Sequence, residues 1–451
     1  MLSRFFDCFV TGCSNPSVRV AGGCGVCERH LCFEHLQPPH HSCDQARLTY
    51  DATWKSHEMD EVQRLQGGIN DAAVSNIVLE LTGKECTIQH FNYDEGMMGC
   101  ANYHARVSFS DGSNPWLLRV PRVSRVSTSL PRLLIDDLIR SEFATLKFLE
   151  NLPIPTARAF AYGVTDDDHG VGVGFILMEE LPGRPWPGAM AGAGSQHSVK
   201  IWQQLAETMA EIQKHPFPMA GSLMPDGASS VKVSAMVTDR FFILGPNGPF
   251  TTAMDYYTAY AEQYLELIAD GQVYTAYPVN AYLLYSFLKE KANQVAADEE
   301  PTFFLKHVDD KGDHLLVDEH FNITGIIDWQ GARVVPRQEA FGYSLVSADM
   351  GLLCSGKAGL GASDAAFAAA SRVAAIRGGV GDDDKVRRYM WGLGSEAEWK
   401  HALPLAERLL EMFGVEMSWA EWKQEAVTAH YAGDARLRAL LENVEKQRGN
   451  N

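Results

Sequence analysis

The segment from Phe303 to Arg333 constrains this chain more than any other part of its sequence. His307 and Asp309 stand in a charged stretch, and two short apolar runs separated by a turn follow them. Asp328 comes directly after the second run. Two such runs joined by a short turn predict a β-hairpin. Because a hairpin returns the chain on itself, we expect Asp328 to lie near Asp309.

Two carboxylates at the same end of a buried hairpin suit phosphoryl transfer. One carboxylate can orient a hydroxyl group or accept its proton, and the other can hold a magnesium ion that bridges phosphate oxygens. Aspartate is also common in turns, and either residue alone would fit that role. The two aspartates together with the flanking apolar runs favour a site over two unrelated turn caps.

The pattern His307-x-Asp309, hairpin, Ile-Ile-Asp328-Trp resembles the aminoglycoside phosphotransferase and choline kinase group of kinase-like enzymes, in particular their fungal relatives. The resemblance implies an α+β, bilobal protein-kinase-like fold, with a small β-rich N-lobe and a larger, mainly helical C-lobe. It implies that Asp309 is catalytic, that His307 supports its loop and that Asp328 binds magnesium. The implied reaction is ATP-dependent phosphorylation of a hydroxyl group on a small molecule that the sequence does not identify.

The chain departs from this family at the position five residues after Asp309, where the family has Asn and this chain has His314. An amide oxygen is a hard ligand of the kind that magnesium prefers, and an imidazole is a poor substitute. Asp313 could supply the oxygen instead, the site could hold one metal ion, or phosphoryl transfer could be lost. Two functions therefore stay open: an active small-molecule kinase, and an impaired pseudokinase that acts as a binding module.

The resemblance also assigns nucleotide contacts in the predicted N-lobe. Gly99 and Asn102 fall in a loop that would face the phosphates, although small residues there could serve only a hairpin bend. Met178 and Glu180 fall at the hinge between the lobes, where backbone groups would hydrogen-bond the adenine. Only backbone atoms would matter at the hinge, so the side chains there carry little information.

A cation and a carboxylate complete the expected nucleotide site. Arg119 stands in a predicted strand where the family usually has the phosphate-pairing Lys. Glu142, on a predicted amphipathic helix, matches the family glutamate that pairs with this cation. An Arg forms forked contacts with phosphate and carboxylate groups, but it is not equivalent to Lys. The alternatives are a solvent-facing strand Arg and an ordinary surface Glu.

Cysteines cluster at the N-terminus, with six of the nine in the first 43 residues. Short spacings between cysteines and histidines, separated by glycine-rich turns, are typical of zinc sites. Eight ligands would suit two tetrahedral ions. The candidate ligands are Cys8, Cys13, Cys24, Cys27, Cys32, His35, His41 and Cys43.

The spacing of this cluster resembles an AN-one-type zinc finger. That resemblance implies two interleaved structural sites, Cys8, Cys13, Cys32 and His35 in one, and Cys24, Cys27, His41 and Cys43 in the other. The spacing alone could confuse His40 with His41. Free buried thiols are the alternative, but a segment of about fifty residues with few aliphatic side chains needs a staple to fold. Family analogy also suggests a protein partner for this module.

Composition excludes some classes of function. The formal net charge of −18 argues against a general nucleic-acid binder, because phosphate backbones favour basic surfaces. No apolar run reaches the roughly 18 residues that a membrane span needs, so no membrane span is expected. The first residues carry charge and cysteines where a secretory signal would be apolar. We therefore expect a cytoplasmic, reducing location, where clustered cysteines bind metal more often than they form disulfides.

The chain is expected to divide into a zinc-finger-like module (1–50), a helical linker (51–85), the N-lobe (86–180) and the C-lobe (181–451). Periodicity predicts strands at 158–162, 173–178, 315–317 and 323–327, a strand pair within 86–121, and helices at 44–82, 134–150, 199–215, 254–269, 281–295, 362–376, 383–394, 397–413 and 419–447. Four tyrosines at helical spacing, between Tyr256 and Tyr264, fit core packing, or a pocket for a cationic substrate.

Overall fold

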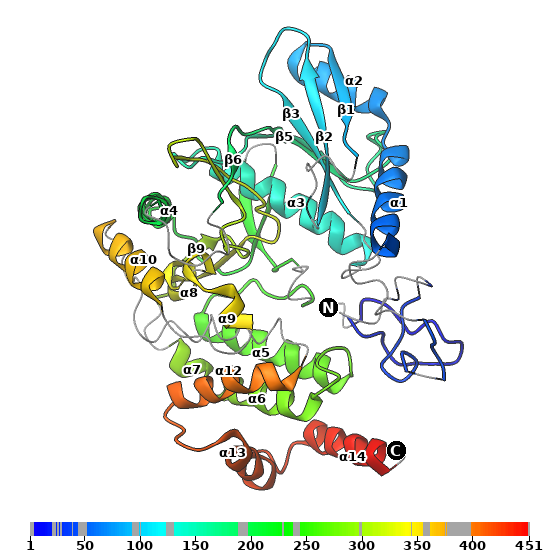
Figure 1. Cartoon of the computed structure of the whole chain (residues 1–451), viewed down its shortest axis with the longest axis vertical. Coiled ribbons are helices and arrows are strands. Elements are labelled where there is room, and N and C mark those ends of the chain that lie inside the picture. Colours follow the sequence, from blue (N-terminus) through cyan, green and yellow to red (C-terminus); the bar gives the residue numbers. More distant parts are fainter. Residues whose placement is uncertain are drawn as a thin grey trace.

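The computed structural model describes residues 4–19, 24, 27, 29–37, 39–43, 52–92, 99, 101–122, 130–187, 197–227, 230–237, 244–296, 300–343, 345–354, 361–374, 376 and 398–449. The predicted helix at 383–394 lies outside these residues. A small sheet-bearing lobe and a larger, mainly helical lobe stand at opposite ends of the long axis (Figure 1). This mixed architecture agrees with the expected α+β, kinase-like fold.

The N-lobe contains a five-stranded antiparallel sheet in the order β1-β2-β3-β5-β4. The β2–β3 turn includes Gly112, whose φ of +76° suits a glycine. This hairpin and the following strands agree with the sequence prediction. The strands are β1 (Cys86–His90), β2 (Asn102–Phe109), β3 (Trp116–Pro121), β4 (Ala159–Gly163) and β5 (Phe175–Glu179).

Two helices, α1 (Ala52–Gly68) and α2 (Asp71–Thr82), pack against one face of this sheet. Val62, Val74 and Val78 on these helices are buried. Alternate strand residues point to opposite faces, so the strands contribute every second side chain to this cluster. The strand members are Tyr103, Ala105, Val107, Leu118, Val120, Phe175 and Leu177.

The prediction of a single helix at 44–82 was wrong, because the described part of this segment forms two helices, α1 and α2. The helix breaks before Asn70, whose side chain accepts a hydrogen bond from the N–H of Ala73 (3.4 Å) and so caps α2. Gly83 ends α2 with φ +71°, as expected for a helix C-terminus. Residues 44–51 lie outside the described part of the chain.

Helix α3 (Arg132–Leu149) lies beside the other face of the sheet and contacts β4 and β5. It also contacts β7 and β8 of the larger lobe. The alternation of the strands directs Asn102, His104 and Arg119 away from the α1–α2 face. These three polar side chains therefore lie on the side of the sheet that faces the rest of the molecule.

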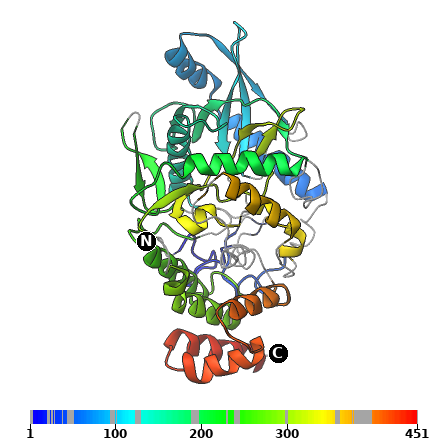
Figure 2. The ribbon, with the colours of Figure 1, turned by 90° about the vertical axis from the view of Figure 1, so that its left-hand side faces the viewer.

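The C-lobe is mainly helical (Figure 2). Helix α5 packs against α6, and α4 packs against α10. The helices are α4 (Ser198–Ile212), α5 (Ala253–Ala269), α6 (Pro278–Glu290), α7 (Ala292–Val295), α8 (Arg337–Phe341), α9 (Met350–Cys354), α10 (Ala362–Val373), α12 (Trp399–Met412), α13 (Trp419–Glu425) and α14 (Ala435–Gly449), with a 3-10 turn η3 (Leu345–Ser347) and a π-helical turn η5 (Ala426–His430).

The long helix predicted at 419–447 was wrong, because η5 and a turn before α14 divide it. The predicted helices at 199–215, 254–269 and 397–413 correspond to α4, α5 and α12. Of the four tyrosines on α5, Tyr256, Tyr257 and Tyr264 are buried. Tyr264 stacks on Tyr285 of α6 with ring centroids 4.3 Å apart, so this group serves core packing.

Short strands connect the helices of the C-lobe. The predicted hairpin is present as β10 and β11, with Leu315 opposite Ile326. Strand β6 pairs with β10, and β9 pairs with β12. The bounds are β6 (Arg184–Pro185), β7 (Ser222–Pro225), β8 (Val231–Ser234), β9 (Phe303–Lys306), β10 (Leu315–Val317), β11 (Ile323–Ile326) and β12 (Arg333–Pro336).

The cysteine module, the described residues between 4 and 43, docks on the C-lobe at the turn after α5. The backbone N–H of Arg19 donates to the carbonyl of Gln272, and its Nε donates to the Gln272 side chain, both at 2.9 Å. The Arg19 guanidinium lies 3.7 Å from the centre of the Phe5 ring, and Phe5 belongs to the main hydrophobic core. Burial lowers the pKa of Arg19 to about 10, and Asp270 and Tyr264 oppose that shift.

Among the helices in the described part of the chain, none is both long and apolar enough to cross a membrane.

Candidate active site

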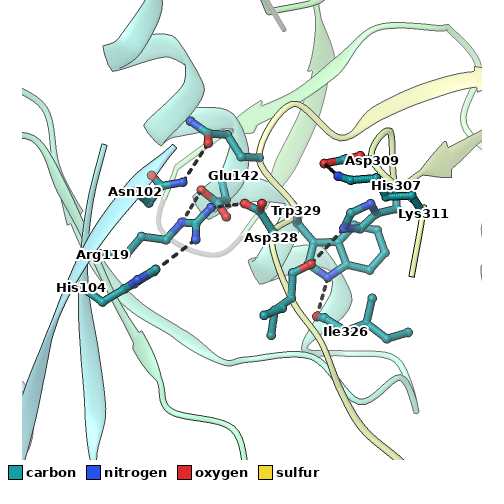
Figure 3. Close-up of polar contacts among 12 residues, drawn as sticks. Asn102, His104, Arg119, Glu142, His307, Asp309, Lys311, Ile326, Asp328 and Trp329 are labelled. Atoms are coloured by element: carbon teal, nitrogen blue, oxygen red, sulfur yellow. Dashed lines mark hydrogen bonds and ion pairs between the residues drawn. The ribbon is translucent and has the colours of Figure 1, made fainter. Parts of the chain in front are cut away.

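Backbone contacts join the loop of Asp309 to the end of the hairpin. His307 follows β9 directly, and its Nε2 donates to the carbonyl of Ile327 (2.9 Å). The N–H of Ile327 donates to the carbonyl of His314 (2.9 Å). Ile327 therefore holds both ends of the loop that carries Asp309, and Asp328 is the next residue. Figure 3 shows His307, Asp309 and Asp328 at this end of the hairpin.

Asp328 adopts a left-handed backbone conformation, with φ +63°. Aspartate tolerates this region better than most residues, at a small energetic cost. Its Oδ1 accepts a hydrogen bond from Nη2 of Arg119 in the N-lobe (Figure 3). The side chain remains 42% exposed, and Oδ2 has no hydrogen-bond partner among the described residues. Burial would raise the pKa of Asp328, but Arg119 lowers it below its ordinary value.

Arg119 also pairs with Glu142 on α3, as the sequence predicted. Its Nε donates to Glu142 Oε2 at 3.1 Å, and both side chains are at least nine-tenths buried. Burial raises the pKa of Glu142 to about 7, and the guanidinium of Arg119 opposes that rise. The buried Arg119 therefore bridges one carboxylate of the N-lobe and one of the C-lobe hairpin.

Two further side chains border Arg119: Asn102, which the sequence analysis expected near the phosphates, and His104, which it missed. His104 lies opposite Arg119 in the β2–β3 register, and its Nε2 accepts from Arg119 Nη1 (3.3 Å). The side-chain amide of Asn102 lies 3.0 Å from Gln330 Oε1. The period of two along β2 could have identified His104, because it lies two residues after Asn102. The contact with Gln330 had no sequence signal, since 228 positions separate the two residues.

Only part of the expected phosphate loop lies in the described chain. Residues 93–98 and 100 fall outside it. Gly99 is described, and its N–H donates to the carbonyl of Asn102 (3.2 Å). This bond bends the chain at the start of β2.

Lys311 is a second residue that the sequence analysis missed. Its Nζ lies 2.5 Å from Asp309 Oδ2 and 3.1 Å from Asp313 Oδ2. Burial raises the pKa of Asp309 above its ordinary value, and Lys311 opposes that rise. In the described part of the chain, Oδ1 of Asp309 has no hydrogen-bond partner. Spacing alone could have identified Lys311, since it follows Asp309 by two residues in the same loop.

His314 is buried within the C-lobe. It is 5% exposed, and its ring stacks on His307 with centroids 4.3 Å apart. Its Nδ1 accepts from the N–H of Gly312 (3.2 Å). Burial lowers the pKa of His314 well below its ordinary value, so the ring is neutral at physiological pH. A buried, stacked imidazole with one nitrogen already engaged fits a magnesium site poorly. Asp313, half exposed, offers an oxygen instead.

At the expected hinge, two backbone donors are already bonded within the protein. The N–H of Glu179 donates to Arg158 O (2.9 Å), and the N–H of Glu180 donates to Pro115 O (3.1 Å). Met178 lies within β5 and is buried. The carboxylate of Glu180 accepts from Arg106 Nε at 2.6 Å. The N–H groups of Glu179 and Glu180 are therefore already engaged within the protein.

Beyond the hinge, Gly183 has φ +117°, and a Cβ at this position would lie 2.3 Å from Thr324 Oγ1. Only glycine lets the chain pass so close to β11, which supports the expected turn into the second lobe.

The cysteine module contains two separate groups of potential metal ligands. In each group the ligand atoms all lie within 4.8 Å of one another. His35 Nδ1 lies 3.3 Å from the sulfurs of both Cys8 and Cys32, and His41 Nε2 lies 3.6 Å from the Cys27 sulfur. The groups are Cys8, Cys13, Cys32 and His35, and Cys24, Cys27, His41 and Cys43.

These groups have the interleaved membership that the finger resemblance implied. His40 stands outside them and packs edge-on against His35.

Comparison with known proteins identifies a family for more than half of this chain. The model of the phosphotransferase enzyme family, APH, matches residues 101–376. No curated protein matches the chain at a significant level. Similar solved structures include a candidate aminoglycoside phosphotransferase of Ralstonia eutropha JMP134, with 15% identity, 79% of this chain and 99% of that chain covered, and a TM-score of 0.43. A candidate fructosamine-3-kinase of Thermobifida fusca YX-ER1 has 18% identity, the same coverage and a TM-score of 0.43.

Proposed function

The chain belongs to the phosphotransferase enzyme family, and we propose that it transfers the γ-phosphoryl group of ATP to a hydroxyl group of a small molecule. The observation that supports this most directly is the double ion pair of Arg119. A buried guanidinium shared between Glu142 of the N-lobe and Asp328 of the hairpin suits a phosphate-binding site at the junction of the lobes. The acceptor molecule is left unspecified, because a fold does not define a substrate.

In this proposal Arg119 positions the α- and β-phosphates, and Glu142 holds Arg119 in place. Asp328 would hold magnesium through its free oxygen, with Asp313 as a second oxygen donor in place of His314. When bound, magnesium would neutralise negative charge that the phosphates carry during the transfer. Two oxygen donors from the protein suit this ion, which keeps several waters in most protein sites.

Asp309 acts on the acceptor hydroxyl. The hydroxyl oxygen forms a bond to the γ-phosphorus, and the bond from that phosphorus to the β–γ bridging oxygen breaks. The bridging oxygen keeps the electron pair and leaves with ADP, while the hydroxyl proton passes to Asp309 Oδ1. Lys311 engages the other oxygen of Asp309 and keeps the carboxylate ionised, and His307 supports the loop through Ile327.

The remaining nucleotide contacts come from the N-lobe. Gly99 and Asn102 border the phosphates, and carbonyl groups near Met178 and Glu180 meet the adenine. These assignments rest on the position of the residues at the start of β2 and at the end of β5.

A catalytically impaired pseudokinase is the second candidate function, and the burial of His314 favours it. If Asp313 does not replace the missing amide oxygen, the site would bind nucleotide weakly or without magnesium. The protein would then act through binding rather than turnover.

For the cysteine module we propose two structural zinc ions, one in each four-residue group. Three thiolates and one imidazole within 4.8 Å are a closed, tetrahedral zinc donor set. Reduced thiols of this kind fit a cytoplasmic location. A protein partner of the module is a further part of this proposal, with Phe9, 59% exposed, as the residue to test.

Calorimetric titration of zinc-loaded protein with ATP, with and without magnesium, tests the proposed function. We expect magnesium-dependent binding that Asp328→Ala abolishes. ATP binding of equal strength with and without magnesium, and equal in Asp328→Ala, would favour the pseudokinase. Absence of ATP binding by the unmodified protein would exclude a working phosphotransferase site.

A further inference from the structure

Helix α1 covers the outer face of the sheet, in a part of the chain that precedes the family match at 101–376. Val62 on this helix is 2% exposed and packs in the cluster under β2 and β3. Gln66, one turn later, donates from Nε2 to the carbonyl of Phe91 (2.9 Å). Residues four apart share one face of a helix. Helix α1 is therefore packed as a part of the N-lobe and not as a free linker.

Arg122, immediately after β3, meets two carboxylates of α1. Its Nη2 donates to Glu61 Oε2 (2.6 Å) and to Glu58 Oε2, and its Nε donates to Glu61 Oε2 (3.2 Å). Arg122 is 3% exposed and Glu58 is 7% exposed. A buried guanidinium without such partners would be strongly unfavourable. The two glutamates, three residues apart on one helix face, therefore fix the place of Arg122.

The same guanidinium reaches the backbone just before β2. Arg122 Nη1 donates to the carbonyl of Gly99 (3.2 Å), and the Arg122 N–H donates to the carbonyl of Ala101 (2.8 Å). Asn102, the next residue, lies in the network around Arg119 (Figure 3). Arg122 thus connects α1 to the backbone that leads into the candidate active site.

We propose that Arg122 is a positioning residue of the nucleotide site, held in place by Glu58 and Glu61 of α1. The proposal rests on the proposed function, since it takes the backbone at Gly99 and Ala101 to lie beside the phosphates. Groups that orient a reacting phosphate must keep their places closely, and a shift of about 1 Å can cost about 100-fold in rate. Arg122 acts through the backbone it holds.

Three variants separate this role from general stability. Glu58→Gln combined with Glu61→Gln keeps the shape of both side chains and removes the two charges that face Arg122. Arg122→Met removes the guanidinium. Asp71→Asn is the matched control, because Asp71 of α2 contacts His90 of β1 at 3.0 Å in the same lobe without touching Arg122.

Two readouts are needed, amide hydrogen exchange at Gly99, Ala101 and Asn102, and calorimetric titration with magnesium and ATP. Arg122→Met and the double glutamine variant should each speed hydrogen exchange at these amides. Each should also weaken ATP binding about tenfold, because a less ordered site loses more conformational entropy when it binds. The control should match the unmodified protein in both.

Folded variants with unchanged exchange and unchanged ATP affinity would overturn the positioning role. If Arg122→Met does not fold, the double glutamine variant decides, because it keeps an acceptor oxygen at each position. An unmodified protein that binds no ATP would overturn the proposed function instead. In that case, unchanged exchange in the double glutamine variant would also show that the Arg122 contact does not order the backbone at Gly99 and Ala101.

Discussion

Arg119 of the sheet and Asp328 of the hairpin form an ion pair that joins the two lobes of the molecule. Nucleotide phosphates would compete with Asp328 for the guanidinium of Arg119. ATP binding should therefore weaken the ion pair between Arg119 and Asp328. Glu142 holds the other side of Arg119 and would keep the cation in place during that exchange.

Removing the guanidinium should destabilise the protein. Arg119→Met leaves Glu142 buried without its cation, and loss of one partner of a buried ion pair typically costs about 3–5 kcal/mol. Adding Glu142→Gln to Arg119→Met should recover much of that loss, because no uncompensated charge remains. The free energy of unfolding in urea measures both effects. Equal stabilities of the single and double variants would show that the unpaired charge of Glu142 is not the cause of the loss.

The proposed proton acceptor is tested by Asp309→Asn, which keeps the size of the side chain. Loss of a general base lowers rates by about 10²–10⁴-fold, so we expect kcat to fall in this range with little change in thermal unfolding. Asp226→Asn serves as the control, since Asp226 is an exposed partner of Lys232 on β8. Turnover by Asp309→Asn equal to that of the control would assign the base elsewhere.

Lys311 should set the acid limb of the pH–rate profile. Burial raises the pKa of Asp309, and the base is lost as the pH falls through that raised value. Lys311→Met removes the charge that opposes the rise, so the acid limb should move to higher pH. Lys311→Arg, which keeps the charge, should return it toward the original position. The measurement is kcat/KM against pH, and identical acid limbs in all three proteins would separate Lys311 from the titration of Asp309.

Local patterns predicted much of the site. The hairpin followed from two apolar runs around a turn. Spacing gave the candidate ligands of the cysteine module, and the resemblance to a zinc finger implied how they divide into two groups. The pairing of Arg119 with Glu142 was also predicted, because a strand cation and a helix carboxylate matched a known pattern. In each case neighbouring residues, or a family motif, carried the information.

Contacts between distant parts of the chain could not be predicted in this way. Arg122 meets Glu58, which lies 64 positions earlier, and neither residue stands out in its local sequence. The burial of His314 depends on its stacking against His307, which only the folded loop defines. Side-chain pairing of this kind depends on backbone placement across the whole lobe, so one sequence does not specify it.

Zinc content tests the cysteine module. Two closed four-ligand groups predict about two zinc ions per chain. Cys24→Ser should lower the content by one ion and leave the other group loaded, because the groups share no residue. Metal analysis by mass spectrometry gives the stoichiometry, and limited proteolysis should show faster cleavage within the module, since bound zinc contributes to its folding. Unchanged zinc content in the variant would remove Cys24 from the ligand set.

His314→Asn tests whether the departure from the family pattern limits the site. Asn would restore an amide oxygen at a position where the present ring is buried and neutral. Changes around a metal site typically alter affinity by about 10–100-fold, so we expect binding of magnesium and ATP to tighten by about tenfold. His314→Ala is the control, since it removes the same ring without supplying an oxygen.

The comparison of these two variants distinguishes the candidate functions. Tighter binding in the Asn variant alone would identify His314 as the cause of a weakened metal site. Equal magnesium dependence in both variants and the unmodified protein would mean that Asp313 already supplies the oxygen, which would support an active phosphotransferase with a modified metal site. In that case Asp313→Ala should lose the magnesium dependence that the His314 variants retain.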